Sequence, residues 1–94
     1  MTPEQLSAAI RAALQSAVDA GDLAITVPAE VRVERPRNRD HGDWSTNIAL
    51  QLAKGAGVAP RELATALATH LASVTGVQAV DVAGPGFLNI TLEA

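Results

Sequence analysis

Val80-Asp81-Val82-Ala83-Gly84-Pro85-Gly86-Phe87-Leu88-Asn89-Ile90 is the stretch that decides the fold of this sequence. On both sides of Gly84-Pro85-Gly86, large aliphatic residues occupy every second position, and this alternation continues to Leu92. A period of two is typical of strands with one buried face, and Gly and Pro are common in the turns that join strands. The stretch therefore predicts a β-hairpin.

The second strand of this hairpin carries an unusual outer face. Because successive side chains point to opposite faces, burying the three aliphatic residues places Phe87, Asn89 and Thr91 on the outside. An exposed aromatic ring with an amide two positions away can stack on an unpaired base and hydrogen-bond its edge, and Asn can pair bidentately with adenine. The alternative is structural: Phe87 lies under the Gly-Pro-Gly turn, and Asn89 is a solvated strand residue.

A first helix is predicted at the N-terminus. Thr2 is suited to be its N-cap, Pro3 its first helical residue and Gln5 the partner that closes a capping box. Gly21 can end it in a left-handed conformation. Its apolar stripe, spaced by three and four residues, is Leu6, Ile10, Ala13, Leu14, Ala17 and Val18.

Two further helices are predicted before the hairpin. The second is expected to have Asp43 as its N-cap, to carry Trp44, and to end at Gly55 or Gly57. The third is expected to begin at Pro60 and to end at Thr75-Gly76. The apolar residues assigned to their buried faces are Ile48 and Leu52, then Leu63, Ala64, Leu67, Ala68 and Leu71.

One strand is predicted between the first two helices. Val31 and Val33 alternate with polar residues before Pro36, which ends the strand, and Ala24 to Val27 could supply another. The order of elements then predicts an α+β fold, with an antiparallel sheet of three or four strands and three helices packed on one face. Ninety-four residues fit one such domain, spanning 1–94.

Composition narrows the possible classes of protein. The chain has no Cys, so disulfides and thiolate metal sites are excluded, and two His offer little for metal binding. The formal net charge is −3 and the isoelectric point is about 5.1, which argues against a protein that coats nucleic acid generally. Neither a membrane-spanning run nor a signal peptide is recognised, so a cytoplasmic location without membrane association is expected.

The positive charge is concentrated in one segment. Four of the seven Lys and Arg residues lie within eight positions, and the stretch from Arg35 to Gly42 has the polar composition of a loop. The functional interpretation is that Arg35, Arg37 and Arg39 contact phosphate and so position an RNA without reading its sequence. The alternative is that Arg32 and Arg35 pair with nearby acids and cover apolar surface with their stems. The acids in question are Glu34, Asp40 and Asp43.

No catalytic site is predicted in this chain. His41 and Asp43 have no Ser, Cys or second carboxylate placed to complete a nucleophile, and they are more simply turn and cap residues. His70 is interpreted as a boundary residue of the third helix. The glycines do not form a dinucleotide-binding fingerprint, because none has the required spacing at a turn from strand to helix.

Two segments resemble one known family. Arg35-Pro36-Arg37-Asn38-Arg39-Asp40-His41-Gly42-Asp43-Trp44-Ser45-Thr46-Asn47-Ile48-Ala49 is similar to the segment with the Gly-Asp-aromatic motif in the N-terminal domain of bacterial arginyl-tRNA synthetases. The hairpin stretch from Val80 to Ile90 resembles that family's Ala-Gly-Pro-Gly-Phe-(Ile or Leu)-Asn motif. Their order and spacing fit too, and the likeness spans essentially the whole chain. One departure is Trp44, where Tyr or Phe is commoner.

The resemblance implies a function for the residues isolated above. In the family, this domain contacts the D-loop of the tRNA and precedes a class I catalytic domain. By this likeness Phe87 would stack on a D-loop base, Asn89 would hydrogen-bond it, and Gly84, Pro85 and Gly86 would shape the approach. The partners implied are arginine tRNA and the catalytic domain.

The resemblance also implies where the chemistry resides. The chain reaches Ala94 without a His-Ile-Gly-His or Lys-Met-Ser-Lys signature, so no cofactor is expected here and ATP is expected only for the parent arginine-tRNA ligase. Two other classes of function stay open. One is a protein-interaction or dimerisation module that uses the exposed sheet face. The other is a single-strand RNA binder of the KH type, which is disfavoured because a Gly-x-x-Gly clamp between two helices is absent.

Overall fold

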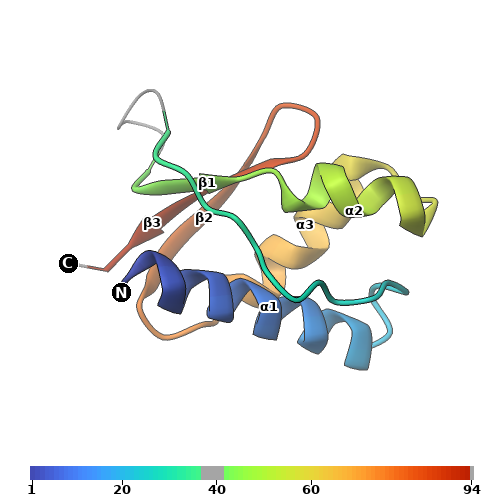
Figure 1. Cartoon of the computed structure of the whole chain (residues 1–94), viewed down its shortest axis with the longest axis horizontal. Coiled ribbons are helices and arrows are strands. Elements are labelled where there is room, and N and C mark those ends of the chain that lie inside the picture. Colours follow the sequence, from blue (N-terminus) through green and yellow to red (C-terminus); the bar gives the residue numbers. More distant parts are fainter. Residues whose placement is uncertain (37–41, 94) are drawn as a thin grey trace.

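A computed structural model describes residues 1–36 and 42–93. The helices and strands, in chain order, are α1 (Pro3–Asp19), β1 (Trp44–Thr46), α2 (Ile48–Ala56), α3 (Pro60–Leu71), β2 (Val77–Ala83) and β3 (Phe87–Leu92). The strands form one antiparallel sheet in the order β1-β3-β2, so β3 is the central strand. Helices α2 and α3 lie against the sheet and α1 packs on α3 (Figure 1). The predicted α+β class and the C-terminal hairpin are confirmed.

The first helix begins and ends as its sequence predicts. Thr2 Oγ1 accepts a hydrogen bond from the Gln5 N–H at 3.1 Å, and Gln5 Oε1 accepts one from the Thr2 N–H at 2.9 Å, which completes the capping box. At the other end Gly21 has a φ of +82°. The N–H of Asp22 then donates to the Ala17 carbonyl at 2.9 Å, so an otherwise unpaired helix carbonyl is satisfied.

The core lies between the three helices and the inner face of the sheet. Its largest side chains are completely buried, and the aliphatic residues of β3 are among them. Burial of this apolar surface is the main favourable contribution to stability in a chain that has no Cys to form disulfides. The fully buried large residues are Leu6, Ile10, Leu14, Leu63, Leu67, Leu71, Leu88 and Ile90.

The prediction that Asp43 caps the second helix and that Trp44 lies within it was wrong. Trp44–Thr46 is instead a strand, in which Trp44 pairs with Ile90 and Thr46 pairs with Leu88. Helix α2 starts at Ile48, whose N–H donates to Thr46 Oγ1 at 3.3 Å. The pairing with β3 buries Thr46 beside the core, and this long-range contact outweighs the local cap signal of Asp43.

The strand predicted at Val31 to Val33 does not form, and Ala24 to Val27 is not a strand either. The Val31 backbone is satisfied by a side chain, because Ser7 Oγ on α1 donates to its carbonyl at 2.6 Å and accepts from its N–H at 3.3 Å. Strand-like pairing is limited to an isolated bridge between Glu34 and Ser45. The third helix also ends earlier than predicted, at Leu71, and turns lead to Gly76.

Candidate nucleic-acid interface

The outer face of the sheet carries the aromatic side chain that the sequence singles out. Phe87, the first residue of β3, is 39% exposed, whereas its neighbour Leu88 is completely buried. The alternation predicted for this strand is therefore confirmed. The ring also lies beside the turn, since a Cβ on Gly84 would stand 3.6 Å from Phe87 Cδ2, and the exposed part of the ring faces solvent.

Three polar residues form a row across this face, one from each strand. Asn89 on central β3 pairs with Ser45 on β1 and with Asp81 on β2. Residues that are directly opposite in antiparallel strands have Cβ atoms about 4.5–5.5 Å apart, so the amide has a hydroxyl on one side and a carboxylate on the other. Asn89 and Ser45 are half-buried and Asp81 is exposed. We call Ser45, Asn89 and Asp81 the polar row.

Phe87 also borders a shallow hollow at the β1 side of the face. The hollow has a volume of about 40 Å³, so it is too small to hold a base. It forms a small notch beside the ring. Its lining combines one cation, one carboxylate, hydroxyls and an amide. The lining residues are Arg32, Glu34, Ser45, Thr46, Asn47 and Phe87.

The turn before Phe87 is held in place by helices α2 and α3. Arg61, in the first turn of α3, donates from Nη1 to the Gly84 carbonyl at 2.8 Å. Gly86 is buried, and a Cβ on it would stand 2.8 Å from the Pro60 Cβ and 3.3 Å from the Leu50 backbone nitrogen. The close approach that Gly86 permits is therefore made by α2 and α3, and it fixes where β3 begins.

The Gly-Asp-aromatic segment docks on the other end of β3. The Asp43 N–H donates to the Ile90 carbonyl at 2.9 Å, and Asp43 Oδ2 accepts from the Leu92 N–H at 2.8 Å. Gly42 has a φ of +101°, and a Cβ there would stand 2.9 Å from the Ile90 carbonyl oxygen. Asp43 thus extends the pairing of central β3 beyond the short strand β1.

Only part of the predicted phosphate site lies in the described part of the chain. The Arg35 guanidinium carbon stands 4.0 Å from the centre of the Trp44 ring, and its Nη1 donates to the Asp43 carbonyl at 3.2 Å. Arg35 therefore covers the Trp44 ring, as the second interpretation expects, but its Nη1 hydrogen bond goes to a backbone carbonyl and not to an acidic side chain. Arg37 and Arg39 lie outside the described residues, as do Asn38, Asp40 and His41.

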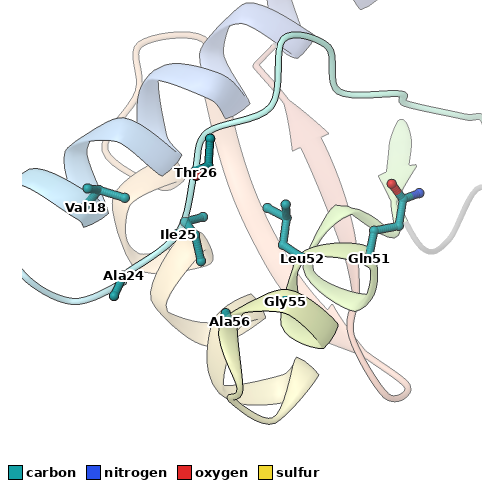
Figure 2. Close-up of a pocket in the computed structure, with 8 residues that line it drawn as sticks. All are labelled: Val18, Ala24, Ile25, Thr26, Gln51, Leu52, Gly55 and Ala56. Carbon is teal, nitrogen blue, oxygen red and sulfur yellow. The ribbon is translucent and has the colours of Figure 1, made fainter.

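Other features of the molecule are distant from this face. A groove of about 560 Å³ between α1, the 24–26 segment and α2 is lined by Val18, Ile25, Leu52 and other uncharged residues, so it offers no charge for a phosphate (Figure 2). His70 contacts Asp22, with 2.8 Å between Nε2 and Oδ2. Among residues 1–36 and 42–93, no cluster of His and acidic residues suits a metal, and no helix is long and apolar enough to cross a membrane.

Sequence reasoning singled out Phe87 and Asn89, but it did not single out Ser45 and Asp81, the other two members of the polar row. Asp81 lies between Val80 and Val82, so the alternation already signalled that it faces outward. Its position opposite Asn89 follows from the register of the hairpin, which spacing alone does not define. Ser45 was missed because its segment was assigned to a helix.

Comparison with known proteins agrees with this description of the fold. The family model described as the arginyl tRNA synthetase N terminal domain matches residues 4–92. An arginine–tRNA ligase of Pseudarthrobacter chlorophenolicus is 65% identical over 97 aligned residues, and one of Renibacterium salmoninarum is 64% identical. In both alignments the match covers all of this chain and 18% of the relative.

A solved structure gives an independent comparison. The arginyl-tRNA synthetase of Thermus thermophilus superposes with a TM-score of 0.73 and 27% identity, over 99% of this chain and 14% of that chain. The family model covers nearly all of the chain, and the structural likeness extends to a more distant relative. This chain therefore belongs to the family of arginyl-tRNA synthetase N-terminal domains.

Proposed function

We propose that this domain binds the D-loop at the elbow of arginine tRNA, within a cytoplasmic arginine–tRNA ligase. The binding would orient the acceptor end of the tRNA for a catalytic domain elsewhere in the same protein, which would use the ATP. The observation that carries the proposal is the outer face of β3, where Phe87 is 39% exposed and Asn89 follows on the same face. Relatives that share this domain are named arginine–tRNA ligases.

The chemistry of the two side chains suits an unpaired base. An aromatic ring stacks on any of the four bases, a contact worth about 1–3 kcal/mol, whereas an amide can donate to and accept from one base edge. The two residues are consecutive on the outer face of a central strand, so the fold fixes their spacing. Phe87 would then supply affinity, and Asn89 would supply selectivity.

Phosphate contacts would come from the basic segment of the sequence. The proposal assigns them to Arg35, Arg37 and Arg39. Arg35 is exposed while it stacks on Trp44, so its guanidinium keeps donors for an incoming phosphate. Such contacts position an RNA but do not read its sequence.

The size of the apolar surface favours a base over a second protein. Among the described residues, the large apolar side chains that are exposed are Met1, Val58 and Phe87, and of these Phe87 belongs to the sheet. A stable protein interface buries about 800 Å² on each partner and has an apolar centre. A single ring beside polar residues fits one stacked base better than it fits a dimer.

Binding of arginine tRNA to variants of the chain tests the proposal. Phe87→Ala should weaken binding by about 1–3 kcal/mol whatever base occupies the D-loop position. Asn89→Ala should instead remove most of the preference for adenine at that position, and circular dichroism should show an unchanged fold. Unchanged affinity in Phe87→Ala, together with an unchanged base preference in Asn89→Ala, would contradict the proposal.

A further inference from the structure

Asp81 is a charged residue at the middle of the proposed base-binding face. It lies on β2 directly opposite Asn89, and the residues that flank it on the same face of β2 are Ala79 and Ala83. These small side chains leave the carboxylate open on both sides along the strand. Within residues 1–36 and 42–93, no side chain hydrogen-bonds to the Asp81 carboxylate. Among the residues that the structure describes, none occupies the acceptors of this exposed group, which leaves them open to a ligand.

A carboxylate in this place restricts what can approach. An ionised carboxylate has acceptors only, so it repels phosphate and carbonyl oxygens and attracts N–H groups. The neighbouring Asn89 amide offers both a donor and an acceptor. Together, the two side chains are complementary to a base edge that presents an amino group, and they keep the sugar-phosphate backbone away from the polar row.

We propose that Asp81 is a specificity-determining residue that accepts a hydrogen bond from the exocyclic amino group of the base stacked on Phe87. This inference rests on the proposed base contact of Phe87 and Asn89. It predicts that the site selects the amino-bearing bases adenine, cytosine and guanine and rejects uracil. The single N–H on the edge of uracil lies between two carbonyl oxygens, and these would face the carboxylate.

The test measures binding of arginine tRNAs that differ only in the D-loop base. The wild-type chain, and the full-length protein that carries it, should bind the adenine form more tightly than the uracil form. Asp81→Asn should reduce that ratio by about tenfold, because Asn can turn its NH2 group toward a uracil carbonyl and accepts a weaker hydrogen bond from adenine than a carboxylate does. Asp81→Asn also removes a negative charge. This charge effect should strengthen tRNA binding equally for every base, so by itself it should not change the ratio.

Glu93→Gln is the matched control for charge. Glu93 is an exposed acid just beyond β3, and its backbone N–H donates to the Gly76 carbonyl. Loss of the Glu93 charge should change the affinity for every tRNA without changing the base ratio. A second measurement needs no protein variant: purine in place of adenine removes only the amino group. That change should weaken binding by the wild-type chain severalfold, and it should weaken binding by Asp81→Asn less.

The results separate this inference from the proposed function. An unchanged adenine-to-uracil ratio in Asp81→Asn, with a ratio that falls in Asn89→Ala, overturns the role of Asp81 and keeps the base contact. If neither Phe87→Ala nor Asn89→Ala changes binding, the base contact itself is absent. Equal losses of the ratio in Asp81→Asn and Glu93→Gln would also overturn the role, because they would indicate a general charge effect.

Discussion

Gly86 lies so close to Pro60 that a Cβ on the glycine would stand 2.8 Å from the Cβ of the proline. The contact joins the turn that precedes Phe87 to the first turn of α3. A methyl group at Gly86 cannot be accommodated unless the turn moves away from the helices. The position of the proposed stacking ring therefore depends on how Gly86 packs against α3.

Gly86→Ala should destabilise the domain by about 1–3 kcal/mol, as overpacking of a buried position does, and should weaken tRNA binding because Phe87 is displaced. Urea denaturation and tRNA titration measure the two effects. Gly55→Ala in α2 is the matched control, because a Cβ at Gly55 meets nothing within 4 Å. That variant should be neutral or more stable by about 0.5–1 kcal/mol. Normal stability and affinity in Gly86→Ala would show that the turn adapts freely.

Asp43→Ala should cost about 1–3 kcal/mol of unfolding free energy, because the part-buried N–H of Leu92 would lose its acceptor. Asp43→Asn retains an oxygen in the same place and should recover most of the loss. Thermal denaturation of both variants measures this difference. Equal stability of the wild type and Asp43→Ala would mean that water replaces the carboxylate without cost.

Leu67→Ala or Leu88→Ala should each cost about 2–5 kcal/mol, because both side chains are completely buried. The wild-type chain should unfold cooperatively as a monomer, since its patterning and packing agree. Circular dichroism and sedimentation measure these properties. A broad melt of the wild type, or a cost below about 1 kcal/mol in both variants, would contradict the assignment of the core.

Arg37→Ala and Arg39→Ala should weaken binding to all tRNAs to about the same extent, and each should lower the salt slope by about 1. Arg35→Ala should have an added effect on stability, because its guanidinium covers Trp44. Binding titrations at several salt concentrations, with a melt for each variant, separate the two effects. A salt slope that stays the same in Arg37→Ala and Arg39→Ala would exclude both residues as phosphate contacts.

Local patterns in the sequence predicted the hairpin, the three helices and the outward position of Phe87. They failed around Asp43, where a good cap residue precedes an aromatic residue and two hydroxyl residues. The decision there depends on β3, a partner more than forty residues away, which pairs with Trp44 and buries Thr46. The strand predicted at Val31 to Val33 was wrong for a similar reason, because Ser7 of α1 hydrogen-bonds the Val31 backbone. Contacts between distant segments decided each of these cases.

The polar row exists only when the chain is folded, because Ser45, Asp81 and Asn89 come from three separate strands that meet in one sheet. Any ligand that uses the row must therefore bind the native state and not the unfolded chain. By mass action, a ligand at about 100 times its dissociation constant adds about 2.7 kcal/mol to the unfolding free energy. The melting temperature of the domain should therefore rise with the fraction of domain that has RNA bound. Thermal denaturation in the presence of different RNAs can then rank them by affinity.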